Sequence, residues 1–254
     1  MRQGALILAA AMLLPAIVRA ADVPAPLAAA RKQVESADYR MSGHMAHVDA
    51  SGARTTDNVE IKAHWFPGVL RVLIAVTSPA NARVHVLLEM RPGGESTIHI
   101  AHPGDAEAAI LPFDRWSEGP LGDGFSYEDF LESSYFWSGQ ASLGAVKYGA
   151  RSCQLLKSTP GAADKTHDAE VKSWLDSSSS FPVYVEKTMK GSGLVKGFTY
   201  FGLRRSEGVW WASQVQEKIR GHADSTFLII DHGSPKAHLG EKDFSTAQLT
   251  HFQD

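Results

Sequence analysis

The sequence has 254 residues, with 25 basic and 28 acidic side chains and a formal net charge of −3 at pH 7. This mildly acidic balance, without a concentrated basic stripe, argues against nucleic acid as a partner, because neutralising phosphates requires such a stripe. The single cysteine, Cys153, excludes an internal disulfide, so packing must hold the fold together. We interpret Cys153 as a small buried hydrophobe.

The first twenty residues have the pattern of a secretory signal peptide. Arg2 gives a basic start, the apolar run Ala5–Leu14 follows, and Pro15 ends it. Val18 and Ala20 then place small residues where a signal peptidase requires them, which predicts cleavage after Ala20. The apolar run is well short of the ~20 residues that span a bilayer, so we expect no stable transmembrane anchor. Residues 21–254 are predicted to form one domain.

The order of predicted elements is one helix followed by many strands. Residues 24–37 combine two prolines with alanine-rich sequence and predict a helix of about three turns. Beyond it, apolar and polar residues alternate between glycine- and proline-containing turns, which is typical of antiparallel strands with one buried face. The predicted strands are 38–48, 58–65, 70–76, 84–90, 96–102, 146–158, 169–174, 181–189, 194–204, 209–219 and 225–231.

Three further segments are less regular. Residues 108–112 fit either a strand or a loop, residues 130–144 fit a helix and loop, and residues 243–249 predict a short terminal helix that docks through Phe244 and Leu249. The predicted fold class is therefore mainly β, an α+β arrangement with about ten or eleven antiparallel strands.

A glycine-broken stretch at residues 119–130 lies between the two runs of strands. Three glycines and a proline fall within six residues, which gives the backbone access to conformations that other residues resist. Ser126 and Asp129 then have the spacing of a helix capping box, so a short helix is expected to start near Tyr127. We interpret the stretch as a joint between two sheets of strands that positions a helix.

The sequence lacks a phosphate loop, a His-Glu-x-x-His pair, a Gly-x-Ser-x-Gly elbow and a Cys-x-x-Cys pair. Asp123, Glu128 and Asp129 could supply a general acid and base, but capping and helix electrostatics also explain them. His44 with His47, and His99 with His102, are three residues apart, which places each pair on opposite faces of a strand. We predict no metal site and no cofactor.

Residues 122–130 resemble the signature of the bacterial outer-membrane lipoprotein-sorting protein family, which is related in fold to the periplasmic lipoprotein carrier and its outer-membrane receptor. The order of the predicted elements is also similar over nearly the whole chain after the signal. In one departure, Gly124 stands where the family usually has an acidic residue directly before the phenylalanine. The residues that carry the resemblance are Gly122, Phe125, Ser126, Tyr127, Glu128 and Asp129.

The resemblance implies a strongly curved, incomplete antiparallel β-barrel with helices over its concave face, and a periplasmic carrier that holds acyl chains between sheet and helices. An inner-membrane transporter is then a candidate partner. Such a carrier needs a dry groove, a mobile cover and a way to release its cargo, but no catalytic residues. In the groove each buried methylene contributes about 0.8 kcal/mol. The candidate groove residues are Trp65, Leu70, Val72, Ile74, Val84, Val86, Leu88, Met90, Phe198, Tyr200 and Trp211, with Tyr135, Phe136 and Trp137 as the cover.

Two alternatives to a lipid or lipoprotein carrier follow from the residues. The first is a periplasmic hydrolase that uses Glu128 or Asp129 together with a histidine from a neighbouring strand. The second is an accessory subunit of an export complex, with the edge of the sheet as its interface.

Overall fold

The computed structural model describes residues 23–119 and 124–252. The predicted signal peptide with its cleavage site, and the motif residue Gly122 with its neighbour Asp123, lie outside the described residues. No helix among the described residues is long and apolar enough to cross a membrane.

The predicted N-terminal helix is confirmed as α1 (Ala25–Glu35). Pro24 stands at its N-cap and Pro26 in its first turn, where the missing N–H costs nothing. Leu27, Ala30 and Val34 are buried, and their spacing places them along one face of the helix. This apolar face packs into the main core of the molecule.

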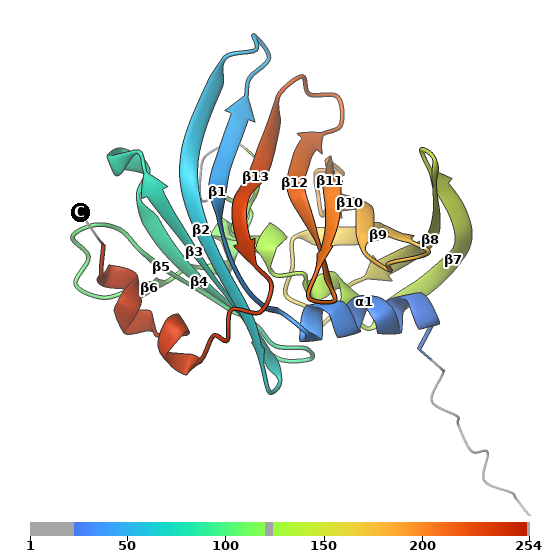
Figure 1. The fold of residues 1–254 in the computed structure, drawn as a ribbon, viewed down its shortest axis with the longest axis horizontal. Coiled ribbons are helices and arrows are strands. Elements are labelled where there is room, and N and C mark those ends of the chain that lie inside the picture. Colours follow the sequence, from blue (N-terminus) through green and yellow to red (C-terminus); the bar gives the residue numbers. More distant parts are fainter. Residues whose placement is uncertain (1–22, 120–123, 253–254) are drawn as a thin grey trace, which may run out of the picture.

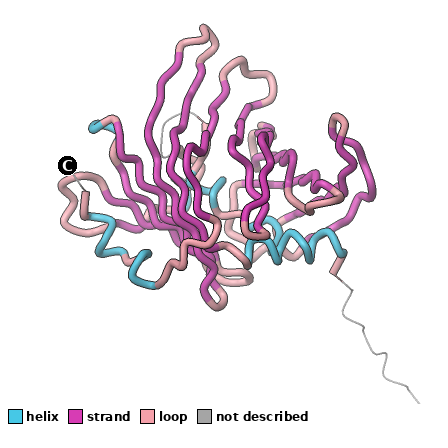
Figure 2. Tube along the Cα trace, viewed as in Figure 1, coloured by secondary structure: helices cyan, strands magenta, loops and turns pink. Residues whose placement is uncertain are grey.

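The described residues form one sheet of thirteen antiparallel strands that curves strongly without closing into a barrel (Figure 1). Figure 2 shows that strands make up most of the molecule. The first run contains β1 (Asp38–Val48), β2 (Arg54–Phe66), β3 (Val69–Ser78), β4 (Val84–Met90), β5 (Thr97–Ala101) and β6 (Ala109–Ile110). The second run contains β7 (Gly139–Tyr148), β8 (Arg151–Thr159), β9 (Asp168–Asp176), β10 (Pro182–Met189), β11 (Val195–Ser206), β12 (Val209–Ile219) and β13 (Ser225–Ser234).

The strand order places the two ends of the central connection at opposite edges of this sheet. The order is β6-β5-β4-β3-β2-β1-β13-β12-β11-β10-β9-β8-β7, so β1 and β13 join the two runs in the middle. Strands β6 and β7 are consecutive in the chain but form the two edges. The expectation of two separate sheets was therefore wrong. The segment of residues 111–138 joins the two edges of one sheet, and we call it the connecting segment.

The predicted mainly β class and incomplete barrel are confirmed, but the strand count of ten or eleven was too low. Strand β6 has only two residues, both exposed, and its sequence fitted a loop equally well. Strand β7 is exposed at most positions, so it lacks the apolar alternation that identifies a half-buried strand. The predicted strand 146–158 is the end of β7 and β8, with a turn at Gly149.

Apolar side chains of the first run meet the connecting segment in the main core. The faces predicted for β2, β3 and β4 are buried there, together with Leu111, Trp116, Leu131 and Tyr135 from the connecting segment. A smaller cluster lies on the opposite face of β3 to β5, under Phe244 and Leu249. The predicted docking of these two residues is confirmed, although they belong to two 3-10 turns, η5 (Glu241–Phe244) and η6 (Thr246–Thr250), rather than one helix.

The junction between β1 and β13 requires glycine at position 43. The register between the two strands shifts between Ser42 and Gly43, and a Cβ at Gly43 would collide with the backbone carbonyl of Ile229. We predict that Gly43→Ala lowers the free energy of unfolding by about 1–3 kcal/mol, the usual cost of overpacking. Gly240→Ala is the matched control, since nothing lies near the Cβ position there. Urea unfolding measures both, and equal losses would contradict the prediction.

Candidate functional site

The predicted helix cap lies in the middle of the connecting segment. The backbone N–H and the hydroxyl of Ser126 both donate hydrogen bonds to Oδ2 of Asp129, each at 2.8 Å. The short 3-10 helix η3 (Tyr127–Phe130) starts immediately after this cap. The expected helix start near Tyr127 is thus confirmed, and one carboxylate oxygen of Asp129 is held by its own turn.

The same carboxylate also binds two lysines of the sheet. Lys187 of β10 and Lys196 of β11 are direct partners in the strand register, and like charges in such a position repel each other. Lys187 Nζ donates to Oδ1 of Asp129 at 2.8 Å, and Lys196 Nζ donates to Oδ2 at 2.7 Å. The carboxylate therefore bridges the two ammonium groups and ties the connecting segment to the sheet.

Burial makes this bridge an electrostatic constraint rather than a surface ion pair. The side chains of Asp129, Lys187 and Lys196 are 4, 12 and 8 % exposed. Burial alone would raise the pKa of Asp129, but the two lysines outweigh it and hold that pKa below its ordinary value. The pKa of Lys187 is raised, because Asp129 and Asp168 outweigh the effect of its own burial. Asp168 itself has a pKa raised by burial to about 6.

Glu128 anchors the connecting segment at a second point. Its carboxylate accepts hydrogen bonds from the hydroxyl of Thr166, from the backbone N–H of His167 at 2.9 Å, and pairs with Nδ1 of His167 at 2.9 Å. The ring of His167 stacks on Phe113, with 4.2 Å between ring centroids. Both carboxylates of the motif are therefore occupied by contacts, Asp129 with β10 and β11 and Glu128 with the two residues before β9.

The departure at Gly124 has a steric reason. Gly124 has φ +135°, which only glycine adopts easily, and a Cβ there would collide with the side chain of Thr226 on β13. Its carbonyl accepts a hydrogen bond from Lys196 Nζ at 3.1 Å. In this chain no side chain fits at the position where the family usually carries an acidic residue.

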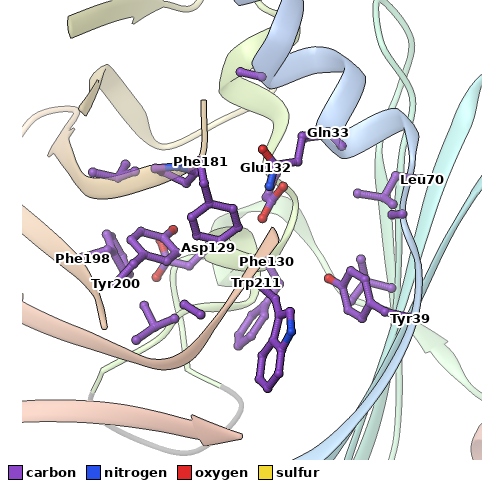
Figure 3. Close-up of a pocket in the computed structure, with 18 of the residues that line it drawn as sticks. Gln33, Tyr39, Leu70, Asp129, Phe130, Glu132, Phe181, Phe198, Tyr200 and Trp211 are labelled. Atoms are coloured by element: carbon purple, nitrogen blue, oxygen red, sulfur yellow. The ribbon is translucent and has the colours of Figure 1, made fainter. Parts of the chain in front are cut away.

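Beside these anchors lies a cavity of about 240 Å³ between α1, the connecting segment and the concave face of β1 to β3 and β10 to β13 (Figure 3). One water molecule needs about 10–15 Å³ of such volume, so the cavity is far larger than a packing defect. Its wall is mainly apolar and aromatic. The labelled side chains that line it are Gln33, Tyr39, Leu70, Asp129, Phe130, Glu132, Phe181, Phe198, Tyr200 and Trp211.

The cavity brings together half of the groove residues that the sequence suggested. Those that line it are Leu70, Val72, Tyr135, Trp137, Phe198, Tyr200 and Trp211. Those that do not line it are Trp65, Ile74, Val84, Val86, Leu88, Met90 and Phe136. The β3 and β4 members of the second set pack in the main core against the connecting segment, and Trp65 stacks on Phe136 at 5.6 Å. The connecting segment fills that half of the concave face.

Sequence reasoning missed several lining residues. Tyr39 and Met41 come from the predicted strand 38–48 and share a face, so their alternation was a usable signal. Phe181 precedes β10, and Glu132 follows η3 in a left-handed conformation with φ 47°. Nothing in the local sequence of these last two indicates that they face the same space.

The fold and cavity define the class of protein: an open, curved antiparallel half-barrel whose concave face is covered but not filled. A family model described as "Uncharacterized protein" matches residues 71–251. The chain belongs to this family. Its fold is the Lol-type fold that the resemblance implied, as the comparison with solved structures shows. No protein with a curated description matches the chain.

Three solved structures share the fold over nearly their whole length. A domain from Vibrio parahaemolyticus named for outer-membrane lipoprotein sorting has 18% identity and a TM-score of 0.79, covering 89% of this chain and 98% of that one. A DUF1329 family protein from Desulfovibrio piger has 16% identity and a TM-score of 0.78, with the same coverage. A LolA superfamily protein from Nitrosomonas europaea has 14% identity, a TM-score of 0.67 and coverage of 88% and 97%.

We predict that Asp129→Ala lowers the free energy of unfolding by about 3–5 kcal/mol, because it removes the carboxylate that binds both buried lysines and leaves only Asp168, 3.8 Å from Lys187, as an ion-pair partner. Ser126→Ala is the matched control, since it removes one capping hydrogen bond and should cost about 1 kcal/mol. Urea unfolding at pH 7 compares the two variants. If they cost the same, Asp129 acts as a cap alone.

Glu217 on β12 supplies a pH-dependent contribution to stability at the same site. It is 2 % exposed, and its Oε1 has no hydrogen-bond partner in the part of the chain that the structure describes. Burial raises its pKa to about 7 from 4.5; Lys196 opposes this shift, whereas Asp129 and Asp224 add to it. The folded protein therefore holds an extra proton between about pH 4.5 and 7, so this contribution to stability falls as pH rises through that window.

We predict that Glu217→Gln is more stable than the wild type by up to about 3 kcal/mol at pH 8, and that the difference shrinks towards zero at pH 4. The amide cannot ionise, so the variant avoids the cost that burial imposes on the carboxylate. Urea unfolding of both proteins at pH 4, 6 and 8 gives the comparison. A difference that is constant with pH would show that the carboxyl group does not titrate in this window.

Proposed function

We propose that this protein is a periplasmic carrier or binding protein for a lipid or a lipidated protein, and that acyl chains bind in the cavity between the curved sheet and its cover. The observation that carries the proposal is the unfilled cavity beneath α1 and the connecting segment. A structural role alone would be served better by a filled core, because each unfilled volume loses packing contacts. An apolar ligand would recover them.

The chemistry of the wall supports an acyl chain as the occupant. Aromatic and aliphatic side chains from α1, the connecting segment, β1 to β3 and β10 to β13 form most of the cavity wall, and polar groups form the smaller part. Each methylene that leaves water for such a wall contributes about 0.8 kcal/mol, so a chain of modest length binds through burial alone. No catalytic group is required for this function.

The anchors of the connecting segment support a permanent cavity. Asp129 holds the segment to β10 and β11, and Glu128 holds it to Thr166 and His167 before β9, so the cover cannot simply collapse onto the sheet. In this proposal the motif residues Phe125, Ser126, Tyr127, Glu128 and Asp129 maintain the cavity rather than bind the ligand. Delivery of cargo by an inner-membrane transporter and secretion through the N-terminal signal belong to the same proposal.

One contact favours the alternative of a hydrolase, namely the pair between Glu128 and Nδ1 of His167. A carboxylate that orients a histidine is part of many acyl-transfer sites. The Glu128 carboxylate, however, also accepts bonds from Thr166 and from the His167 backbone, and the imidazole stacks on Phe113. Among the described residues no hydroxyl or thiol is hydrogen-bonded to the other ring nitrogen of His167. A carrier is therefore the better-supported function.

We predict that Ala37→Phe abolishes acyl-chain binding without unfolding the protein. Ala37 lies between α1 and β1, lines the cavity and is only partly buried against the main core, so a phenyl ring there occupies the space of the ligand. Ala141→Phe is the matched control, because Ala141 is exposed on the edge strand β7. Native mass spectrometry of purified and of delipidated, reloaded protein measures bound lipid, and circular dichroism verifies folding.

Two outcomes would contradict the carrier. One is wild-type protein that neither co-purifies with lipid nor takes it up after delipidation. The other is turnover of an ester panel that disappears in a folded His167→Gln variant, which would support the hydrolase instead.

A further inference from the structure

One carboxylate of the cavity wall is not used by the fold. Five acidic side chains line the cavity, namely Asp38, Glu128, Asp129, Glu132 and Asp168. Asp38 accepts hydrogen bonds from the backbone of His238 and Leu239, and the next two are the anchors described above. Asp168 lies 3.8 Å from Lys187. Glu132 alone among these five has no hydrogen bond or ion pair within the described part of the chain.

Glu132 is a solvent-accessible residue of the cavity wall that is nevertheless partly dehydrated. Its side chain is exposed, yet protein surrounds it closely enough that burial raises its pKa, an effect that Lys187 partly opposes. Because Glu132 lines the cavity, a group bound there can reach its carboxylate. A carboxylate so placed has lost much of its hydration and has gained no partner in exchange, which is costly.

The backbone holds Glu132 in this position at a further cost. Its φ and ψ of 47° and 25° belong to the left-handed region, which is unfavourable for a residue with a Cβ. Strain of this kind persists only where the surroundings enforce it, and it gathers at ligand sites. Glu132 lies between η3 and η4 (Ser133–Phe136), and the strained backbone places this unpaired carboxylate at the cavity wall.

Aromatic rings surround the same space. Figure 3 shows Glu132 together with the rings of Phe130, Phe181, Tyr200 and Trp211 around one cavity. The phenol of Tyr200 has a pKa raised by burial and then by the charge of Glu132, so the two groups interact. Aromatic faces attract ammonium groups, and the attraction is stronger where water is excluded.

The lining is poorly suited to an anionic head group. Lys187 is the one basic side chain among the described residues that line the cavity, and it is already bound to Asp129. A ligand carboxylate or phosphate would therefore meet Glu132 without a free cation to offset the repulsion. The Nε1–H of Trp211 is a buried donor without a partner in the described residues, so it can accommodate a neutral carbonyl of the ligand.

We propose that the cavity selects an amphiphile with an ammonium group, whose alkyl chain lies along the aromatic wall and whose ammonium group pairs with Glu132. This inference rests on the proposed function and specifies the ligand class within it. The ammonium group is shared by two sources, an amine-bearing lipid head group and an amine near the lipid attachment of a lipidated protein.

The test compares dodecylamine, dodecanol and dodecanoic acid, which share one alkyl chain, as competitors of a fluorescent apolar probe bound to the delipidated protein at pH 7. The wild type should bind the amine about ten-fold or more tightly than the alcohol, and the acid least tightly. Glu132→Gln should remove the preference for the amine and leave alcohol binding unchanged. Glu107→Gln, an exposed carboxylate on the surface before β6, is the matched control and should keep the wild-type order.

Each result decides the proposal. Equal binding of amine and alcohol, or an amine preference that survives in Glu132→Gln, overturns it while leaving an apolar carrier intact. Failure of all three alkyl probes to bind contradicts the carrier itself. A thermal melt verifies that Glu132→Gln is folded, which we expect because it removes an unpaired charge. Binding of lysophosphatidylethanolamine and of a palmitoylated lysine peptide then distinguishes the lipid head group from the lipidated protein as the source of the ammonium group. Loss of binding of either ligand in Glu132→Gln supports the proposal.

Discussion

The structure depends on one carboxylate that neutralises two lysines. Lys187 and Lys196 face each other across β10 and β11 on the concave side of the sheet, where their charges would repel and their desolvation would be unfavourable. Asp129 resolves both problems, because each of its oxygens accepts a bond from one lysine. The carboxylate arrives from a segment about sixty residues away in sequence, so it fixes the path of the chain as well as the local charge.

The need for that path comes from the topology. Strands β6 and β7 follow one another in the chain but stand at opposite edges of the sheet, so the residues between them must pass from one edge to the other. Their apolar side chains, including Trp116 and Leu131, fill the concave face beside β3 and β4. Over β10 and β11 the segment is held by the buried carboxylate of Asp129 and by the packing of Phe125 against Phe198, and the space beside it stays open. The cavity is thus a consequence of covering a wide curved sheet with one short helix and one crossing segment.

Local patterns in the sequence were sufficient for the parts of the fold that depend on local physics. Alternation identified the buried faces of β2, β3 and β4, and the spacing of Ser126 and Asp129 predicted the start of η3. Strand β7 escaped detection because an exposed edge strand has no buried face to mark it. The two lysines on Asp129 could not be inferred, since their pairing depends on the register of β10 with β11 and on the crossing of the connecting segment. The same holds for Glu132, whose relation to Phe181 and Tyr200 exists only once the sheet has curved.

The polar residues at this site fall into two groups that differ in what their burial achieves. For Asp129 and Glu128, nearly every acceptor position is filled by the protein, so their burial yields a fixed geometry.

Glu217 and Glu132 are buried or enclosed without full compensation, and they reduce stability when ionised. Glu217 lies beside the lysine bridge, where the charge of Lys196 reduces its cost. Glu132 borders open space, and only a group that enters that space can supply the missing counter-charge. The uncompensated charge and the unfilled volume therefore occur at the same place, and one ligand with an apolar chain and a cationic group would satisfy both.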